Sequence, residues 1–105
     1  MALYRRGVNR VVITLGKLGA VMMSAEGLWQ ARPPAIKVVS AVGSGDSFLG
    51  GLVTALARNL PTPEALQWAV ATGAANALAV GGGKIRQRDV EALYAQTRTT
   101  HLVAN

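Results

Sequence analysis

The chain has 105 residues, of which half are hydrophobic and 15% are charged, and its formal net charge is +6 at pH 7. This length fits one small domain, and the absence of cysteine excludes disulfide bonds and thiolate metal sites. The 11 lysines and arginines allow an anionic partner, but they are scattered along the chain, so we expect no nucleic-acid binding.

The sequence also bears on location. The first ten residues carry three arginines and no apolar core, so no signal peptide is predicted, and the lack of cysteine fits a cytoplasmic protein. Residues 65–83 are uncharged, but they contain Gln67, Thr72 and Asn76. A spanning helix needs about 20 strongly apolar residues, so we expect a buried helix here and no membrane contact.

The first 42 residues are expected to form mostly strands. Residues 2–7 (ALYRRG) are typical of a helix tail that ends at a glycine. The β-branched run at residues 11–13 predicts a strand buried on both faces, as in a parallel sheet. Residues 20–34 predict a hairpin that turns at Glu26 and Gly27, and residues 35–42 predict a fourth strand.

Helical spacing begins at Gly45 and predicts a helix up to about Leu60. Thr62 is the expected N-cap of a second helix that continues to about Val80. A third helix is predicted over residues 88–97.

The tail, residues 99–105, is expected to be frayed, which gives an order of strands followed by three helices. The helices come late, and the first strand lacks parallel neighbours within the chain. Since buried parallel strands need helices on both faces, we expect an α/β fold that is incomplete on its own.

The turn between the fourth strand and the first helix carries the sequence VGSGDSF. A helix N-terminus leaves N–H groups unpaired, and Gly43, Ser44 and Gly45 could present such groups to a phosphate. Asp46 follows directly, where it could take the proton of a hydroxyl that attacks phosphorus. The alternative is that Asp46 only stabilises the first helical turn.

Other common motifs are excluded by single positions. A Walker loop would require glycine at Leu78, and a dinucleotide fingerprint would require glycine at Phe48. A nucleophile elbow around Ser44 would require glycine at Val42. The one histidine, His101, lies in the tail, so a Ser–His–Asp triad lacks a base.

Three segments together resemble the ribokinase-like, or PfkB, family of carbohydrate kinases. They are VVITLGKLGAV from residue 11, VGSGDSFLGGLVTAL from residue 42 and ATGAANALAVGGG from residue 71. The resemblance implies a three-layer α/β/α domain, of which residues 1–105 would be the C-terminal nucleotide-binding and catalytic-base portion. It implies ATP as phosphoryl donor, with Mg²⁺ bound through the nucleotide phosphates and no metal ligand from this chain.

The resemblance also implies roles for individual residues. Asp46 resembles the base that activates the sugar hydroxyl, and Gly43, Ser44 and Gly45 resemble the anion hole for the transferred phosphoryl group. The residues implied in nucleotide binding are Thr14, Gly16, Gly19, Asn76, Gly81 and Gly83.

The acceptor implied by the resemblance is a sugar phosphate. The chain is similar to the branch of the family that contains 1-phosphofructokinase and tagatose-6-phosphate kinase, which points to fructose 1-phosphate or tagatose 6-phosphate. Ser40 and Val42 stand where many members carry the aspartate and threonine of a monovalent-cation site, which puts a potassium requirement in doubt.

The chain lacks the family's sugar pocket, its lid and an Asn-x-x-Glu motif. We therefore expect no useful turnover from these residues alone, and a homodimer only in the complete enzyme. The alternative reading is a non-catalytic nucleotide- or anion-binding module, or an inactive fragment.

Overall fold

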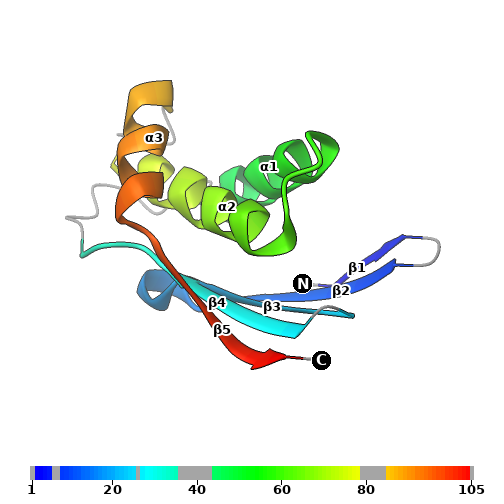
Figure 1. Cartoon of the computed structure of the whole chain (residues 1–105). Helices are drawn as coiled ribbons and strands as arrows, with labels where there is room; N and C mark the ends of the chain where they lie inside the picture. The colour runs from blue at the N-terminus through cyan, green and yellow to red at the C-terminus, as the bar shows by residue number, and fades with distance from the viewer. Residues whose placement is uncertain (1, 6–7, 26, 36–43, 79–84, 105) are drawn as a thin grey trace.

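The structure is a computed structural model that describes residues 2–5, 8–25, 27–35, 44–78 and 85–104 (Figure 1). One antiparallel sheet holds five strands in the order of the chain. The strands are β1 (Ala2–Arg5), β2 (Val8–Thr14), β3 (Ala20–Ser24), β4 (Gly27–Arg32) and β5 (Arg98–Ala104).

Three helices lie over one face of this sheet (Figure 1). They are α1 (Ser44–Ala57), α2 (Thr62–Ala77) and α3 (Gln87–Gln96), and a short 3₁₀ helix, η1 (Gly16–Leu18), joins β2 to β3. The expected α/β class is therefore confirmed, and within the described residues the helices form a single layer.

The prediction of a parallel strand buried on both faces was wrong. The strand β2 pairs antiparallel with β1 and with β3. Its Val12 is fully buried toward the helices, whereas the neighbouring Ile13 is 52% exposed on the other side. A β-branched run indicates a strand but not its partners, and the short connection to β3 permits only antiparallel pairing.

The predicted helix tail at residues 2–7 was also wrong, because residues 2–5 form β1 and pair with β2. A single helical turn without a helix body has an unfavourable nucleation free energy. Pairing with the edge of β2 instead satisfies the backbone groups of β1.

Residues 98–104 form a strand rather than a frayed tail, so the predicted order, which ended on three helices, lacks this last strand. The strand β5 pairs antiparallel with β4 along its length. The His101 ring stacks on the Trp29 indole with ring centroids 4.6 Å apart and an interplanar angle of 8°. This contact and the ladder hydrogen bonds hold β5 at the sheet edge.

Other elements follow the sequence closely. The hairpin of β3 and β4 is confirmed, with Ser24 opposite Gly27, and α1 and α3 begin within one residue of their predicted starts. The N-cap of α2 is Pro61 rather than Thr62, and the helix ends at Ala77. The fourth predicted strand, apart from Ala35, lies outside the described residues.

The core lies between the sheet and the first two helices. Its largest fully buried side chains are Val12 and Met22 from the sheet, Leu52 from α1 and Leu66 from α2. Alternate residues of β2, β3 and β4 point into this core, which is the period of two expected of strands with one buried face.

The opposite side of the sheet carries an apolar surface, which we call the far face, and Gln30 and Arg32 of β4 border it. It is formed by Val11, Ile13, Val21, Met23 and Leu28, which the strand register places in cross-strand pairs such as Val11 with Met23 and Ile13 with Val21. Met23 is 53% exposed and Ile13 is 52% exposed. An antiparallel sheet whose outer face meets water normally carries polar residues there, so this face is suited to burial.

Candidate active site

The predicted anion hole lies at the start of α1. Ser44 is the first residue of the helix, Gly45 and Asp46 follow in its first turn, and both of these are exposed. A Cβ built on Gly45 would have no atom within 4 Å, so the approach to the helix N-terminus is open at this residue. The first-turn N–H groups and the helix dipole favour a bound anion here. Gly43 lies outside the described residues.

The second group of predicted residues forms the turn between β2 and β3. Thr14 ends β2 with its side chain exposed, and the Leu15 N–H donates to the Gly19 carbonyl oxygen at 2.7 Å. Gly16 and Gly19 have φ angles of +59° and +87°, in the left-handed region that favours glycine.

Gly19 has a second reason to be glycine. A Cβ at this position would lie 1.9 Å from the Ala31 carbonyl oxygen, so no side chain fits between the turn and β4. Glycine at position 19 therefore allows the turn to pack directly against β4. This packing requires glycine independently of any bound nucleotide.

Asn76 is buried near the end of α2, with 3% of its surface exposed. The Ser47 hydroxyl donates a hydrogen bond of 3.1 Å to the Asn76 Oδ1 atom (from α1 to α2). This contact brings a residue predicted for nucleotide binding next to the helix that carries Asp46.

Sequence reasoning missed Ser47. A signal was present, because Ser47, Gly50, Gly51 and Thr54 fall on one stripe of α1 at helical spacing. Such a stripe of small residues indicates close helix packing, and Ser47 is its polar end beside Asp46.

The remaining predicted residues are not joined to this contact. Gly81 and Gly83 lie outside the described residues. In the part of the chain that the structure describes, no hydrogen bond or ion pair links Asp46 to Thr14 or to the 14–19 turn.

Among the described residues, no three His, Cys, Asp or Glu side chains are grouped so that they could hold a metal ion. In the same residues, every helix is too short or too polar to cross a bilayer.

The profile of the family described as pfkB family carbohydrate kinase matches residues 1–88, which include α1 with Asp46 and all of α2. The chain belongs to the PfkB family. The family resemblance inferred from the three sequence segments is thereby confirmed.

Two similar PfkB proteins come from Escherichia coli. The 1-phosphofructokinase of strain K12 is 44% identical over 73 residues, which are 70% of this chain and 23% of that enzyme. The crystal structure of phosphofructokinase-2 in complex with substrates and products matches with a TM-score of 0.78 and 37% identity, over 82% of this chain and 28% of the other.

A more distant structural neighbour confirms the ribokinase-like fold. The ribokinase of Thermotoga maritima matches with a TM-score of 0.71 and 24% identity, over 82% of this chain and 30% of the other. The chain therefore spans less than a third of the length of each of these PfkB proteins.

Proposed function

We propose that residues 1–105 are the C-terminal nucleotide-binding and catalytic-base portion of a PfkB kinase that phosphorylates a hydroxyl of a sugar phosphate with ATP. One observation carries the proposal. Asp46 is exposed in the first turn of α1, beside open space at Gly45, within the segment that matches the PfkB profile. The E. coli relatives are named as phosphofructokinases, which supports a sugar phosphate as the acceptor.

The chemistry follows from this position. The carboxylate of Asp46 accepts the proton of the acceptor hydroxyl as its oxygen forms a bond to the γ-phosphorus and the bond to the ADP oxygen breaks. The backbone N–H groups of Gly43, Ser44 and Gly45 stabilise the negative charge on the transferred group.

The nucleotide would lie against Thr14, Gly16 and Asn76, with Gly81 and Gly83 completing its pocket and Gly19 supporting the turn. Acidic residues are few, at five in the chain, and the described ones form no cluster suited to a metal. As the family resemblance implies, Mg²⁺ would be bound through the ATP phosphates, where it neutralises their charge.

Fructose 1-phosphate is the first acceptor to test, because the 1-phosphofructokinase of E. coli is 44% identical to this chain and isozyme 2 of its 6-phosphofructokinase is 37% identical. Tagatose 6-phosphate is the second. We further propose that the complete kinase acts in the cytoplasm and forms a homodimer.

The test is a chimera in which this chain replaces the matching portion of E. coli 1-phosphofructokinase. We expect ADP release that depends on fructose 1-phosphate. Asp46→Asn should lower kcat by about 10²–10⁴-fold, since a general base contributes that much, while ATP still binds. The control is Asp89→Asn on α3, which removes the only other aspartate and should leave kcat unchanged.

A normal kcat in the Asp46→Asn chimera would show that Asp46 only stabilises the first turn of the helix. The isolated chain should show no turnover, because positioning the acceptor supplies much of phosphoryl-transfer catalysis. Clear turnover by the isolated chain would contradict the assignment as a portion of a kinase.

A second candidate is a nucleotide- or anion-binding module without catalysis. The observation that favours it is the open N-terminus of α1 at Gly45, which can hold an anion whether or not Asp46 acts as a base. Calorimetric titration of the isolated chain with ATP distinguishes the two. Binding of ATP together with an inactive chimera would favour the module.

A further inference from the structure

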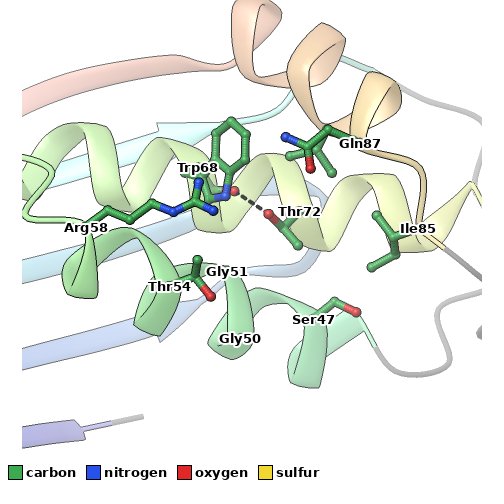
Figure 2. A pocket seen from close by; sticks show the side chains of 10 residues that line it. Ser47, Gly50, Gly51, Thr54, Arg58, Trp68, Thr72, Ile85 and Gln87 are labelled. Carbon is green, nitrogen blue, oxygen red and sulfur yellow. Dashed lines mark hydrogen bonds between the residues drawn. The ribbon is translucent and has the colours of Figure 1, made fainter.

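An open groove lies between α1 and α2 and is bordered by the start of α3 (Figure 2). Its volume is about 380 Å³, which is within the range of small-molecule sites. Its lining includes Gly50, Thr54, Arg58, Trp68, Ile85 and Val90.

The groove exists because small residues face each other across the two helices. A Cβ on Gly51 would lie 2.7 Å from the Thr72 Oγ1 atom, so the helices approach closely at this point. One residue earlier, a Cβ on Gly50 would have no atom within 4 Å, so the surface of α1 is open there. Close approach and a missing side chain together leave a hollow beside the contact.

One end of the groove is cationic. Arg58 is the one charged residue among those described as lining it, and Figure 2 shows its side chain extending toward Trp68. Within the described residues, no ion pair or hydrogen bond engages the Arg58 guanidinium. An exposed guanidinium without a partner presents its donors in the planar arrangement that matches an oxyanion.

The wall opposite Gly50 is apolar. Trp68 is half-buried and packs on Tyr94 with ring centroids 5.4 Å apart, so its indole is held in place. Ile85 and Val90 continue this wall at the start of α3. A flat ring could lie between this wall and the open surface at Gly50.

We propose that the groove binds a small aromatic anion, with its ring against Trp68 and Ile85 and its oxyanion on Arg58, assisted by the Thr54 hydroxyl. At one end the groove borders the proposed nucleotide site, because Ser47 lines it and donates its hydroxyl to Asn76. Figure 2 shows Arg58 at the other end, and we place the anion there. The proposal does not depend on the kinase function.

The probe is 2-naphthoate, and its uncharged analogue 2-naphthylmethanol is the control ligand. The chain has only two tryptophans, so a nitrogen–proton correlation spectrum shows two indole signals. We expect naphthoate to shift the Trp68 signal and leave the signal of Trp29, which is buried between sheet and helices, in place. The alcohol should bind about tenfold more weakly, as expected for loss of a charge-assisted contact.

Two variants test the geometry. Arg58→Gln should weaken naphthoate binding by about tenfold and leave binding of the alcohol unchanged. Gly50→Leu fills the open space with a good helix former and should abolish binding of both ligands. The matched control is Arg32→Gln on β4, which removes one exposed arginine elsewhere and should leave both affinities unchanged. An unshifted Trp29 signal shows that each variant is folded.

Three results would overturn the proposal. The first is an unmoved Trp68 signal up to about 1 mM naphthoate, the weak end of specific binding. The second is equal affinity for naphthoate in the parent chain, Arg58→Gln and Gly50→Leu. The third is displacement of naphthoate by ATP, because the groove would then be part of the nucleotide site.

Discussion

Among single residues, the two glycines of the β2–β3 turn are glycine for different reasons. Gly16 is favoured by its backbone conformation alone, and Gly19 by its backbone conformation and by close packing. Both have positive φ, but only Gly19 lies against a neighbour, since its Cβ would lie 1.9 Å from the Ala31 oxygen, whereas Gly16 has open space. In the sequence, the VVITLGKLGAV segment places both glycines between two expected strands. It could not show which glycine touches β4, because that contact joins residues 12 positions apart.

The first prediction compares these positions. Gly19→Ala should lower the free energy of unfolding by roughly 2–4 kcal/mol, because backbone strain and a steric clash add. Gly16→Ala should lower it by about 1 kcal/mol, the strain alone. Urea unfolding measures both, and equal losses in the two variants would contradict the role assigned to Ala31.

A second prediction concerns Tyr94. Burial, and next the nearby Glu64 carboxylate, raise the pKa of the Tyr94 hydroxyl above 10.0. The folded state therefore favours the protonated hydroxyl over tyrosinate. This preference stabilises the fold fully at pH values below the pKa of Tyr94 in the unfolded chain. The stabilisation is lost as the pH rises through the raised pKa of Tyr94 in the folded chain.

Tyr94→Phe keeps the ring against Trp68 and removes the ionisation. The variant should lose less stability than the parent between pH 9 and pH 11 or so, the range around a tyrosine pKa of about 10. Urea midpoints across this range provide the measurement. Glu64→Gln removes the second cause and should give a smaller change in the same direction, and parallel pH profiles in all three proteins would refute the assignment.

Among elements, the contact between α1 and α2 depends on small residues that face each other. Gly51→Ala should destabilise the fold by about 1–3 kcal/mol, because the new methyl meets Thr72, whose hydroxyl already donates to the Trp68 carbonyl oxygen at 2.8 Å. Gly50→Ala should stabilise it by about 0.5–1 kcal/mol, because open space surrounds that position. Thermal and urea unfolding of the two variants measure these changes in stability. Changes of the same sign in both variants would contradict the prediction.

Gln67 joins three elements. Its Nε2 atom donates to the Tyr94 carbonyl oxygen at 2.8 Å, and the Thr99 hydroxyl donates to its Oε1 atom at 3.1 Å, which ties α2 to the end of α3 and to β5. Gln67→Ala should lower the free energy of unfolding by about 1–2 kcal/mol through these lost hydrogen bonds. Hydrogen exchange of the β5 amides should also rise.

The matched control is Gln96→Ala. Gln96 is exposed, and its side chain donates only to the Ala92 carbonyl oxygen of its own helix at 3.2 Å. Its loss should change stability by less than about 0.5 kcal/mol. Equal effects at Gln67 and Gln96 would show that the link from α2 to β5 adds no stability.

Helices were more predictable than strands for a physical reason. The period of apolar residues lies within each helix, so α1 and α3 begin within one residue of their predicted starts. The partner of β5 is β4, which precedes all three helices, so no local pattern contains it. The partner of β1 is the next strand, but ALYRRG has no strand alternation to show it. Asp46 could be found from its place after a glycine turn, whereas the Ser47–Asn76 contact required the packing of two helices.

For the whole molecule, the main feature is that the helices of the described residues lie over one face of the sheet (Figure 1). The far face leaves Ile13 and Met23 half-exposed, although the exposed face of an antiparallel sheet is usually polar. Incompleteness was predicted from the sequence on the argument that parallel strands need two helix layers. The strands are antiparallel, so that argument does not apply. The apolar far face gives a different physical reason to expect that the fold is incomplete on its own.

The last prediction uses this face. Ile13→Lys with Met23→Lys should prevent activity of the chimera with 1-phosphofructokinase, because the charges would be buried against the rest of the kinase. The same pair should reduce self-association of the isolated chain in analytical ultracentrifugation. Val53→Lys on α1, also at a position 53% exposed, should change neither measurement. A chimera that stays active with both lysines would show that this face remains in water.

An apolar sheet that meets water is also what chaperones and proteases recognise in a cell. A copy of this chain whose far face stays bare would be degraded sooner than a copy whose far face is covered. In the proposed kinase the rest of the polypeptide would cover the far face, so the folding of that part would decide how long these residues survive in the cell.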